Sequence, residues 1–98
     1  MKKGYVFAEV EIHDPDNYPI YSVTVAPTLE PYGGKILVRG GAREQLEGED
    51  ALHHSGLRTV ILEFPSVQQA RDWYFSEAYT RLREMRQQWS TGRLCIVE

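Results

Sequence analysis

The chain is poor in cysteine and carries no excess of positive charge. Cys95 is the only cysteine among 98 residues, which excludes an internal disulfide and a metal site built from several cysteines. Eleven Lys and Arg residues against 14 Asp and Glu residues give a formal net charge of -3, so no broad basic surface is available to phosphate backbones. We therefore expect no nucleic-acid partner.

Long hydrophobic runs are also missing. No apolar run approaches the roughly 20 residues that a membrane-spanning helix needs. Residues 1–14 include two lysines but no uninterrupted apolar segment of the kind found in a signal peptide. These absences predict a soluble, cytoplasmic protein without a membrane partner.

The residues that are present are typical of a globular domain. Hydrophobic residues make up 42% and charged residues 26% of the sequence, as in folded proteins and unlike disordered segments. At this length roughly 60–70% of the surface of the unfolded chain can be buried, which suffices for one modest core. We expect residues 1–98 to form a single domain.

The clearest local pattern begins at residue 57. Val60, Leu62 and Phe64 occupy every second position of a β-branched run, which is the period of a strand. Pro65 follows directly and cannot continue the pairing because it lacks an N–H group. A strand over residues 57–64 is therefore predicted to stop at this proline.

Two helix starts follow the proline. Ser66 and Gln69 have the spacing of a capping box, in which each side chain satisfies a backbone donor of the first helical turn. Ser76 is a second candidate N-cap. The helix after it carries an apolar stripe at helical spacing, made of Tyr79, Leu82, Met85 and Trp89. Thr91-Gly92 is predicted to end this helix.

Three further strands are predicted from alternation. Residues 5–12 and 93–97 alternate along their length, and residues 35–39 form a shorter alternating run. Gly40-Gly41 interrupts this run, and residues 42–46 would continue it past a bulge.

One more helix is predicted between the first two strands. Asp14 is placed as its N-cap and Pro15 as its first residue. Pro19 and Pro27 should kink or break it before Gly33-Gly34, since each lacks an N–H group and crowds the preceding turn.

The predicted order is strand, helix, strand, strand, helix, strand. This is the βαββαβ order of the ferredoxin-like fold, an α+β architecture with a four-stranded antiparallel sheet and helices on one face. One face of the strands is wholly apolar and should lie under the helices: Val6, Ala8, Val10, Ile36, Val38, Val60, Leu62, Phe64, Leu94 and Ile96.

The opposite face of the sheet is mixed rather than polar. It carries apolar residues from every strand: Phe7, Leu37, Ile61, Cys95 and Val97. Single exposed apolar residues are normal, but a patch that crosses the sheet indicates a covered face. The commonest cover is a second copy related by two-fold symmetry. We therefore expect a homodimer of the dimeric α/β barrel type.

Three runs of the sequence resemble a known family. They are GYVFAEVEIHDPDNY at residues 4–18, YGGKILVRGG at 32–41 and ILEFPSVQQARDWYFSEAY at 61–79. The runs fall in the order of, and resemble, the family called domain of unknown function 1330, and the likeness extends over nearly the whole chain. The resemblance implies a dimeric α/β barrel and no established activity. The chain departs from the family at Pro19 and in residues 52–57.

Related barrels include cofactor-independent monooxygenases, isomerases and haem enzymes, so fold alone does not choose a reaction. Haem binding would require an axial histidine facing a large cavity.

Charged residues on the mixed face are the first candidate ligand site. Glu9, Arg39, Glu63 and Arg93 project onto that face, where a carboxylate beside a guanidinium could orient a polar or acidic ligand. The alternative is an ion-pair cluster that sets the register of the dimer. In the family that the chain resembles, RGG is a signature, which maps to residues 39–41.

Two aromatic residues are the second candidate site. Trp73 and Tyr79 lie at core-like helical spacing and in the family's DWY and SEAY segments. They could pack in the core, or line a cavity whose polar edge a tyrosine hydroxyl would reach.

No metal or cofactor site is predicted. Adjacent His53 and His54 match no zinc template, and His13 beside Asp14 is a strand-end residue, with a role as general base left open. Cys95 is most simply a small buried hydrophobe. Neither a GxSxG nor a GxxxxGK[ST] motif occurs, so neither a hydrolase nor a nucleotide-binding protein is supported.

Two functions from different classes fit the sequence. The first is a small homodimer that binds a small organic molecule beside the sheet, with cofactor-independent oxygenation or isomerisation as its candidate chemistry. The second is a non-catalytic module whose main contact is with itself.

Overall fold

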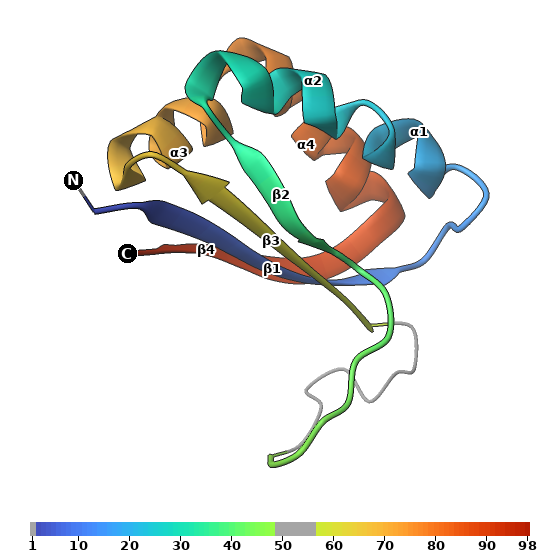
Figure 1. The fold of residues 1–98 in the computed structure, drawn as a ribbon. Helices are drawn as coiled ribbons and strands as arrows, with labels where there is room; N and C mark the ends of the chain where they lie inside the picture. Colours follow the sequence, from blue (N-terminus) through green and yellow to red (C-terminus); the bar gives the residue numbers. More distant parts are fainter. Residues whose placement is uncertain (1, 49–56) are drawn as a thin grey trace.

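The computed structural model describes residues 2–48 and 57–98. Its elements follow in the order β1 (Gly4–Ile12), α1 (Tyr18–Ser22), α2 (Val25–Leu29), η1 (Glu30–Tyr32), β2 (Lys35–Arg39), β3 (Leu57–Phe64), α3 (Val67–Tyr74), α4 (Glu77–Trp89) and β4 (Ser90–Val97). The strands lie in the order β2-β3-β1-β4 and every neighbouring pair is antiparallel. All helices cover one face of the sheet (Figure 1), which confirms the predicted α+β fold.

The core lies between the helices and the inner face of the sheet. The largest fully buried side chains are Trp73, Tyr79, Phe64, Val6 and Val10. The alternating residues of β1 and β3 are predicted correctly: β1 buries Val6, Ala8 and Val10, and β3 buries Leu62 and Phe64 and packs the partly buried Val60 against the core.

Both predicted helix caps after β3 are confirmed. The Gln69 N–H donates to Ser66 Oγ at 3.1 Å, and the Tyr79 N–H donates to Ser76 Oγ at 3.2 Å. The capping box is only half formed: Gln69 Oε1 accepts from the Ser66 hydroxyl (3.1 Å) rather than from the Ser66 backbone N–H, and Gln69 Nε2 donates to the Tyr32 carbonyl (3.2 Å). This side chain therefore ties α3 to η1.

The helical segment before β2 is broken, as its prolines predict. It consists of α1, α2 and the short η1 turn, and the Thr24 hydroxyl caps the end of α1 by donating to the Tyr21 carbonyl at 2.8 Å. The predicted start at Pro15 is wrong. Asp14 accepts from the backbone and side chain of Asn17 and organises a turn, and α1 begins at Tyr18. These bonds lower the pKa of Asp14.

The last strand begins earlier than predicted. Thr91-Gly92 does not end a helix; α4 runs to Trp89, and β4 starts at Ser90 without a loop. Gly92 lies opposite Val10 in the sheet. A Cβ at Gly92 would lie 2.2 Å from the Glu9 carbonyl oxygen, so this close approach of two strands requires glycine.

A β-bulge in β2 changes which side chains face the helices. Ile36 pairs with Leu62, but Val38 pairs with Ile61 and Arg39 with Val60, so Leu37 is the extra residue. The assignment of Val38 to the inner face and of Arg39 to the outer face is therefore wrong, and the two are exchanged. Residues 42–46 form no strand.

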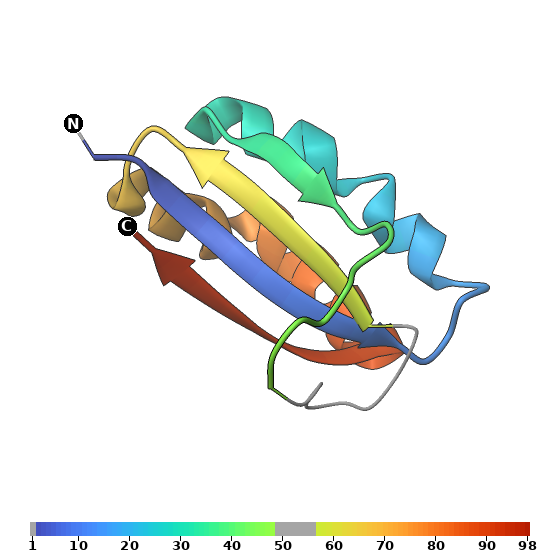
Figure 2. The same cartoon turned by 60° about the horizontal axis from the view of Figure 1, so that its bottom comes forward.

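No helix of residues 2–48 and 57–98 lies on the outer face of the sheet (Figure 2). Phe7 lies at its centre, opposite Ile61 on one side and Cys95 on the other. Leu37 and Val97 at its edges are 51% and 47% exposed. Cys95 is exposed here, so its prediction as a buried residue is wrong for the single subunit.

The described residues contain no helix that is long and apolar enough to cross a membrane. The predicted loop with His53 and His54 falls in residues 49–56 and so lies outside the described residues.

Candidate functional site: a cavity between the helices and the sheet

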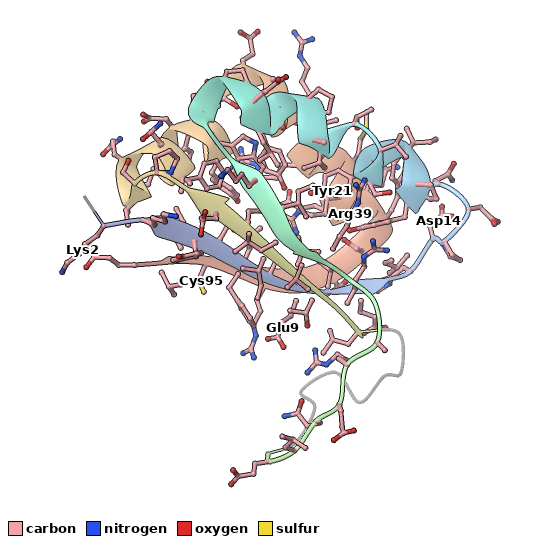
Figure 3. All side chains as sticks on the ribbon, in the orientation of Figure 1. Lys2, Glu9, Asp14, Tyr21, Arg39 and Cys95 are labelled. Atoms are coloured by element: carbon pink, nitrogen blue, oxygen red, sulfur yellow. The ribbon has the colours of Figure 1, made fainter. Side chains whose placement is uncertain are left out.

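The charged residues predicted to form one site are divided between two faces. Glu9 lies on the outer face, where it accepts from Arg93 Nε at 2.9 Å and pairs with Arg43 at 3.3 Å. Glu63 pairs separately with Lys3 at 3.3 Å. Figure 3 shows Glu9 and Arg39 on opposite sides of the sheet. The predicted combination of Arg39 with these carboxylates is therefore wrong.

The outer cluster of Glu9, Arg43 and Arg93 is an ion-pair network at the surface. The Arg93 side chain is 76% exposed while that of Glu9 is 14% exposed. Exposed pairs of this kind contribute little stability. Arg43 was missed by the sequence reasoning because residues 42–46 were assigned to a strand rather than to a segment that folds back over Glu9.

A cavity of about 50 Å³ lies on the inner side of the sheet. Its walls are mostly apolar, and its polar lining groups belong to Tyr18, Tyr21, Ser22, Arg39, Arg58, Trp73, Tyr79 and Arg86. Three of the predicted ligand residues, Arg39, Trp73 and Tyr79, therefore meet at one cavity. Glu9 and Glu63 are not among its lining residues.

A chain of three hydrogen-bonded side chains forms the polar part of the cavity wall. The hydroxyls of Tyr21 and Tyr79 are 2.9 Å apart, and Arg86 Nε donates to the Tyr79 oxygen at 3.3 Å. Tyr79 is fully buried and Arg86 is 7% exposed. Burial, together with the neighbouring Tyr79, raises the pKa of Tyr21 far above its ordinary value. Tyr21 therefore keeps its proton at every physiological pH.

Trp73 supplies an aromatic wall rather than a polar group. Its indole Nε1–H donates to Thr28 Oγ1 at 3.0 Å, and its ring lies 4.0 Å from the Tyr79 ring between centroids. Core packing and cavity lining were the two alternatives for Trp73 and Tyr79. Both apply, because each residue is buried in the core and also lines the cavity.

Arg86 is a charged residue on the buried side of α4. Burial by itself lowers the pKa of its guanidinium, but the Tyr79 hydroxyl and the neighbouring tyrosines offset that effect and the net shift is upward. The side chain therefore stays charged. Its spacing could have revealed this placement, since Arg86 follows Leu82 by four residues and Tyr79 by seven, on the buried stripe of α4.

Arg58 and Arg39 come from the ends of β3 and β2. Arg58 lies opposite Val10 on the inner face, 6.0 Å from the centre of the Tyr18 ring, and donates to the Arg39 carbonyl at 3.1 Å. Arg39 donates to the Ser22 carbonyl at 3.2 Å. Figure 3 shows Arg39 directed toward α1, in the region of Tyr21.

The structure explains why glycine occupies position 40 in the RGG run. Gly40 has a φ of 76°, which favours glycine. A Cβ at this position would lie 2.4 Å from Arg58 Nε. Gly40 thus both turns the chain and leaves room for the guanidinium below it.

The described residues contain no group of three or more His, Cys, Asp or Glu side chains that could hold a metal ion. His13 is exposed beyond β1 and does not line the cavity.

Comparison with known proteins agrees with this fold. A family model described as domain of unknown function (DUF1330) matches residues 3–98. No curated protein matches the chain.

Several solved structures are similar in fold. A protein of unknown function from Rhodopseudomonas palustris has a TM-score of 0.73 at 22% identity, over 97% of this chain and 80% of that one. SnoaB, a cofactor-independent oxygenase from Streptomyces nogalater, has a TM-score of 0.69 at 11% identity, over 100% and 93% of the chains. These similarities show that the chain shares the α+β fold of those proteins and leave the activity open. The chain belongs to the DUF1330 family.

Proposed function

We propose that this protein is a homodimer that binds a small organic molecule in the cavity between the helices and the sheet of each subunit. The observation that carries the proposal is the Tyr21–Tyr79–Arg86 chain in the cavity wall. A core that serves only stability would be filled with apolar side chains, because burying a charge costs free energy. The polar chain therefore supports a binding role.

The cavity residues favour one kind of chemistry. A tyrosine hydroxyl and a guanidinium can stabilise negative charge that develops on a carbonyl or phenol oxygen. Cofactor-independent oxygenation and isomerisation both pass through such an anion, and the fold similarity to SnoaB supports this class. The described lining residues include no carboxylate or imidazole, so the substrate would have to lose its proton to water, and these side chains would stabilise the charge left on its oxygen.

The outer face supports the dimer. Phe7, Ile61, Val38 and Val97 form an apolar strip that crosses the four strands. A second copy packed face to face would bury this strip, and the pairs of Glu9 and Glu63 would lie at its margins.

Fragment binding tests the ligand site. Neutral and charged small molecules are titrated into ¹⁵N-labelled protein, and the indole N–H signal of Trp73 is followed in heteronuclear correlation spectra. Binding fragments should shift this signal, and Arg39→Ala should weaken them while the dimer persists. Arg93→Ala, which removes the same charge from the outer face, is the matched control. A library that leaves Trp73 unmoved would refute the binding site.

Sedimentation tests the dimer and the alternative function. The native chain should sediment as a dimer at micromolar concentration, and Ile61→Lys should yield a folded monomer because a charge then lies in the strip. A native monomer refutes the dimer. A dimer that binds no fragment supports the alternative, a non-catalytic module that only self-associates.

A further inference from the structure

We propose that the molecule bound in this cavity is a compact organic acid, held through its carboxylate. The inference rests on the proposed ligand site and adds the chemical class of the ligand. It is carried by the charges of the lining residues, which are all of one sign.

Three arginines are among the residues that line the cavity, and no Asp or Glu accompanies them. Arg39 is exposed, Arg58 is half-buried and Arg86 is buried, so the positive charge extends from the surface to the interior. Among residues 2–48 and 57–98, none of the three forms an ion pair. The whole chain is acidic, with a formal charge of -3, whereas the charged residues that line the cavity are all positive.

Part of the hydrogen-bonding capacity of these groups is unused. Arg58 Nε is buried and has no hydrogen-bond partner among the described residues. Arg58 and Arg39 each donate to a backbone carbonyl, which satisfies a donor without neutralising the charge. A buried cation without a counter-charge is unfavourable, and a carboxylate is the planar anion that a guanidinium binds through two parallel hydrogen bonds.

The tyrosine pair adds a donor for the same anion. Arg86 donates to the Tyr79 oxygen, and the hydrogen-bond dipoles align when Tyr79 donates onward to Tyr21. The Tyr21 hydroxyl hydrogen is then available to a ligand oxygen in the cavity. An acid thus meets positive charge and a neutral donor together.

The cavity volume limits the body of the acid. About 50 Å³ is well below the roughly 150 Å³ of an apolar cavity that holds benzene. A short aliphatic acid fits within it. A larger acid would have to leave its apolar part at the mouth beside Arg39, where the lining is exposed.

Matched acids and amides test the inference. Propionate, isobutyrate and benzoate are each compared with the corresponding primary amide, at constant ionic strength set with chloride, by the Trp73 signal and by calorimetry. Each acid should bind at least about tenfold more tightly than its amide, the factor that corresponds to about 1.4 kcal/mol. Arg58→Met and Arg86→Met should remove this preference. Arg81→Met, at an exposed position of α4, should retain it.

The outcomes separate this inference from the proposed function. Equal binding of acids and amides at Trp73 would overturn the acid and leave the ligand site standing. Failure of all six probes and of the wider fragment library would overturn both. A preference for acids that survives both Arg58→Met and Arg86→Met would also refute the inference, because the anion would then be bound elsewhere. Circular dichroism and sedimentation confirm that each variant is folded and dimeric.

Discussion

Replacing Tyr79 with phenylalanine should destabilise the protein more than the same change at Tyr21. The Tyr79 hydroxyl is the middle member of the buried chain, 2.9 Å from the Tyr21 hydroxyl and 3.3 Å from Arg86 Nε. Tyr79→Phe leaves two buried polar groups without this partner and keeps the ring that packs on Trp73. Tyr21→Phe leaves the bond between Arg86 and Tyr79 in place.

The magnitudes follow from the number of groups left unpaired. A buried group without a partner costs about 1–3 kcal/mol, more when it is charged, and a hydrogen bond lost without that penalty costs about 1 kcal/mol. Tyr79→Phe should therefore lower the free energy of unfolding by about 2–4 kcal/mol and Tyr21→Phe by about 1 kcal/mol. The double variant no longer leaves the Tyr21 hydroxyl unpaired, so it should cost less than the sum of the two.

Urea denaturation followed by circular dichroism measures these values. Protein concentration is held constant, because dimer formation would contribute to the apparent stability. A coupling energy of about 1 kcal/mol is expected between the two positions. If Tyr21→Phe costs as much as Tyr79→Phe, or if the two costs simply add, the hydroxyl chain does not stabilise the core as argued.

Three further predictions concern backbone fit and titration. Gly92→Ala should cost about 3 kcal/mol or more in thermal or urea unfolding, because its Cβ would lie 2.2 Å from a carbonyl oxygen of β1; a change below about 1 kcal/mol would contradict the close approach. Gly40→Ala should weaken binding of benzoate, since its Cβ would displace Arg58, whereas Gly41→Ala, with positive φ but no atom within 4 Å, should leave binding unchanged; equal effects would contradict the role assigned to Gly40. Burial holds the pKa of Tyr21 above its ordinary value of 10.0, so the stability that its protonated form contributes is fully present below about pH 10 and is lost above it, by up to about 1.4 kcal/mol per pH unit. Tyr21→Phe should make the loss of unfolding free energy with rising pH shallower. An unchanged dependence of that free energy on pH would argue against burial of the Tyr21 hydroxyl.

The order of elements and most of the core could be predicted from the sequence. Alternation in residues 5–12 and 57–64 and the caps at Ser66 and Ser76 are local signals, and the structure reproduces them. Local signals suffice here because side-chain period and cap chemistry depend on neighbours in the chain.

The placement of Arg39 could not be predicted, because a bulge leaves no clear mark in an apolar strand. The run from Ile36 to Val38 alternates acceptably in either register, and one extra residue sends every later side chain to the other face. The contact of Tyr21 with Tyr79 spans 58 positions, so no spacing rule anticipates it. The position of Arg86 was accessible to helical spacing and was missed.

The bulge at Leu37 gives this fold a simple means of changing its chemistry. Without the bulge, Leu37 would pair with Ile61 in a regular ladder, which would direct the Val38 side chain inward and the Arg39 side chain outward. An aliphatic side chain would then lie where the guanidinium now contacts Ser22. The entrance of the cavity would select for apolar, uncharged molecules. Relatives whose β2 pairs without this bulge should therefore differ in the polarity of what they accept, without any rearrangement of the helices.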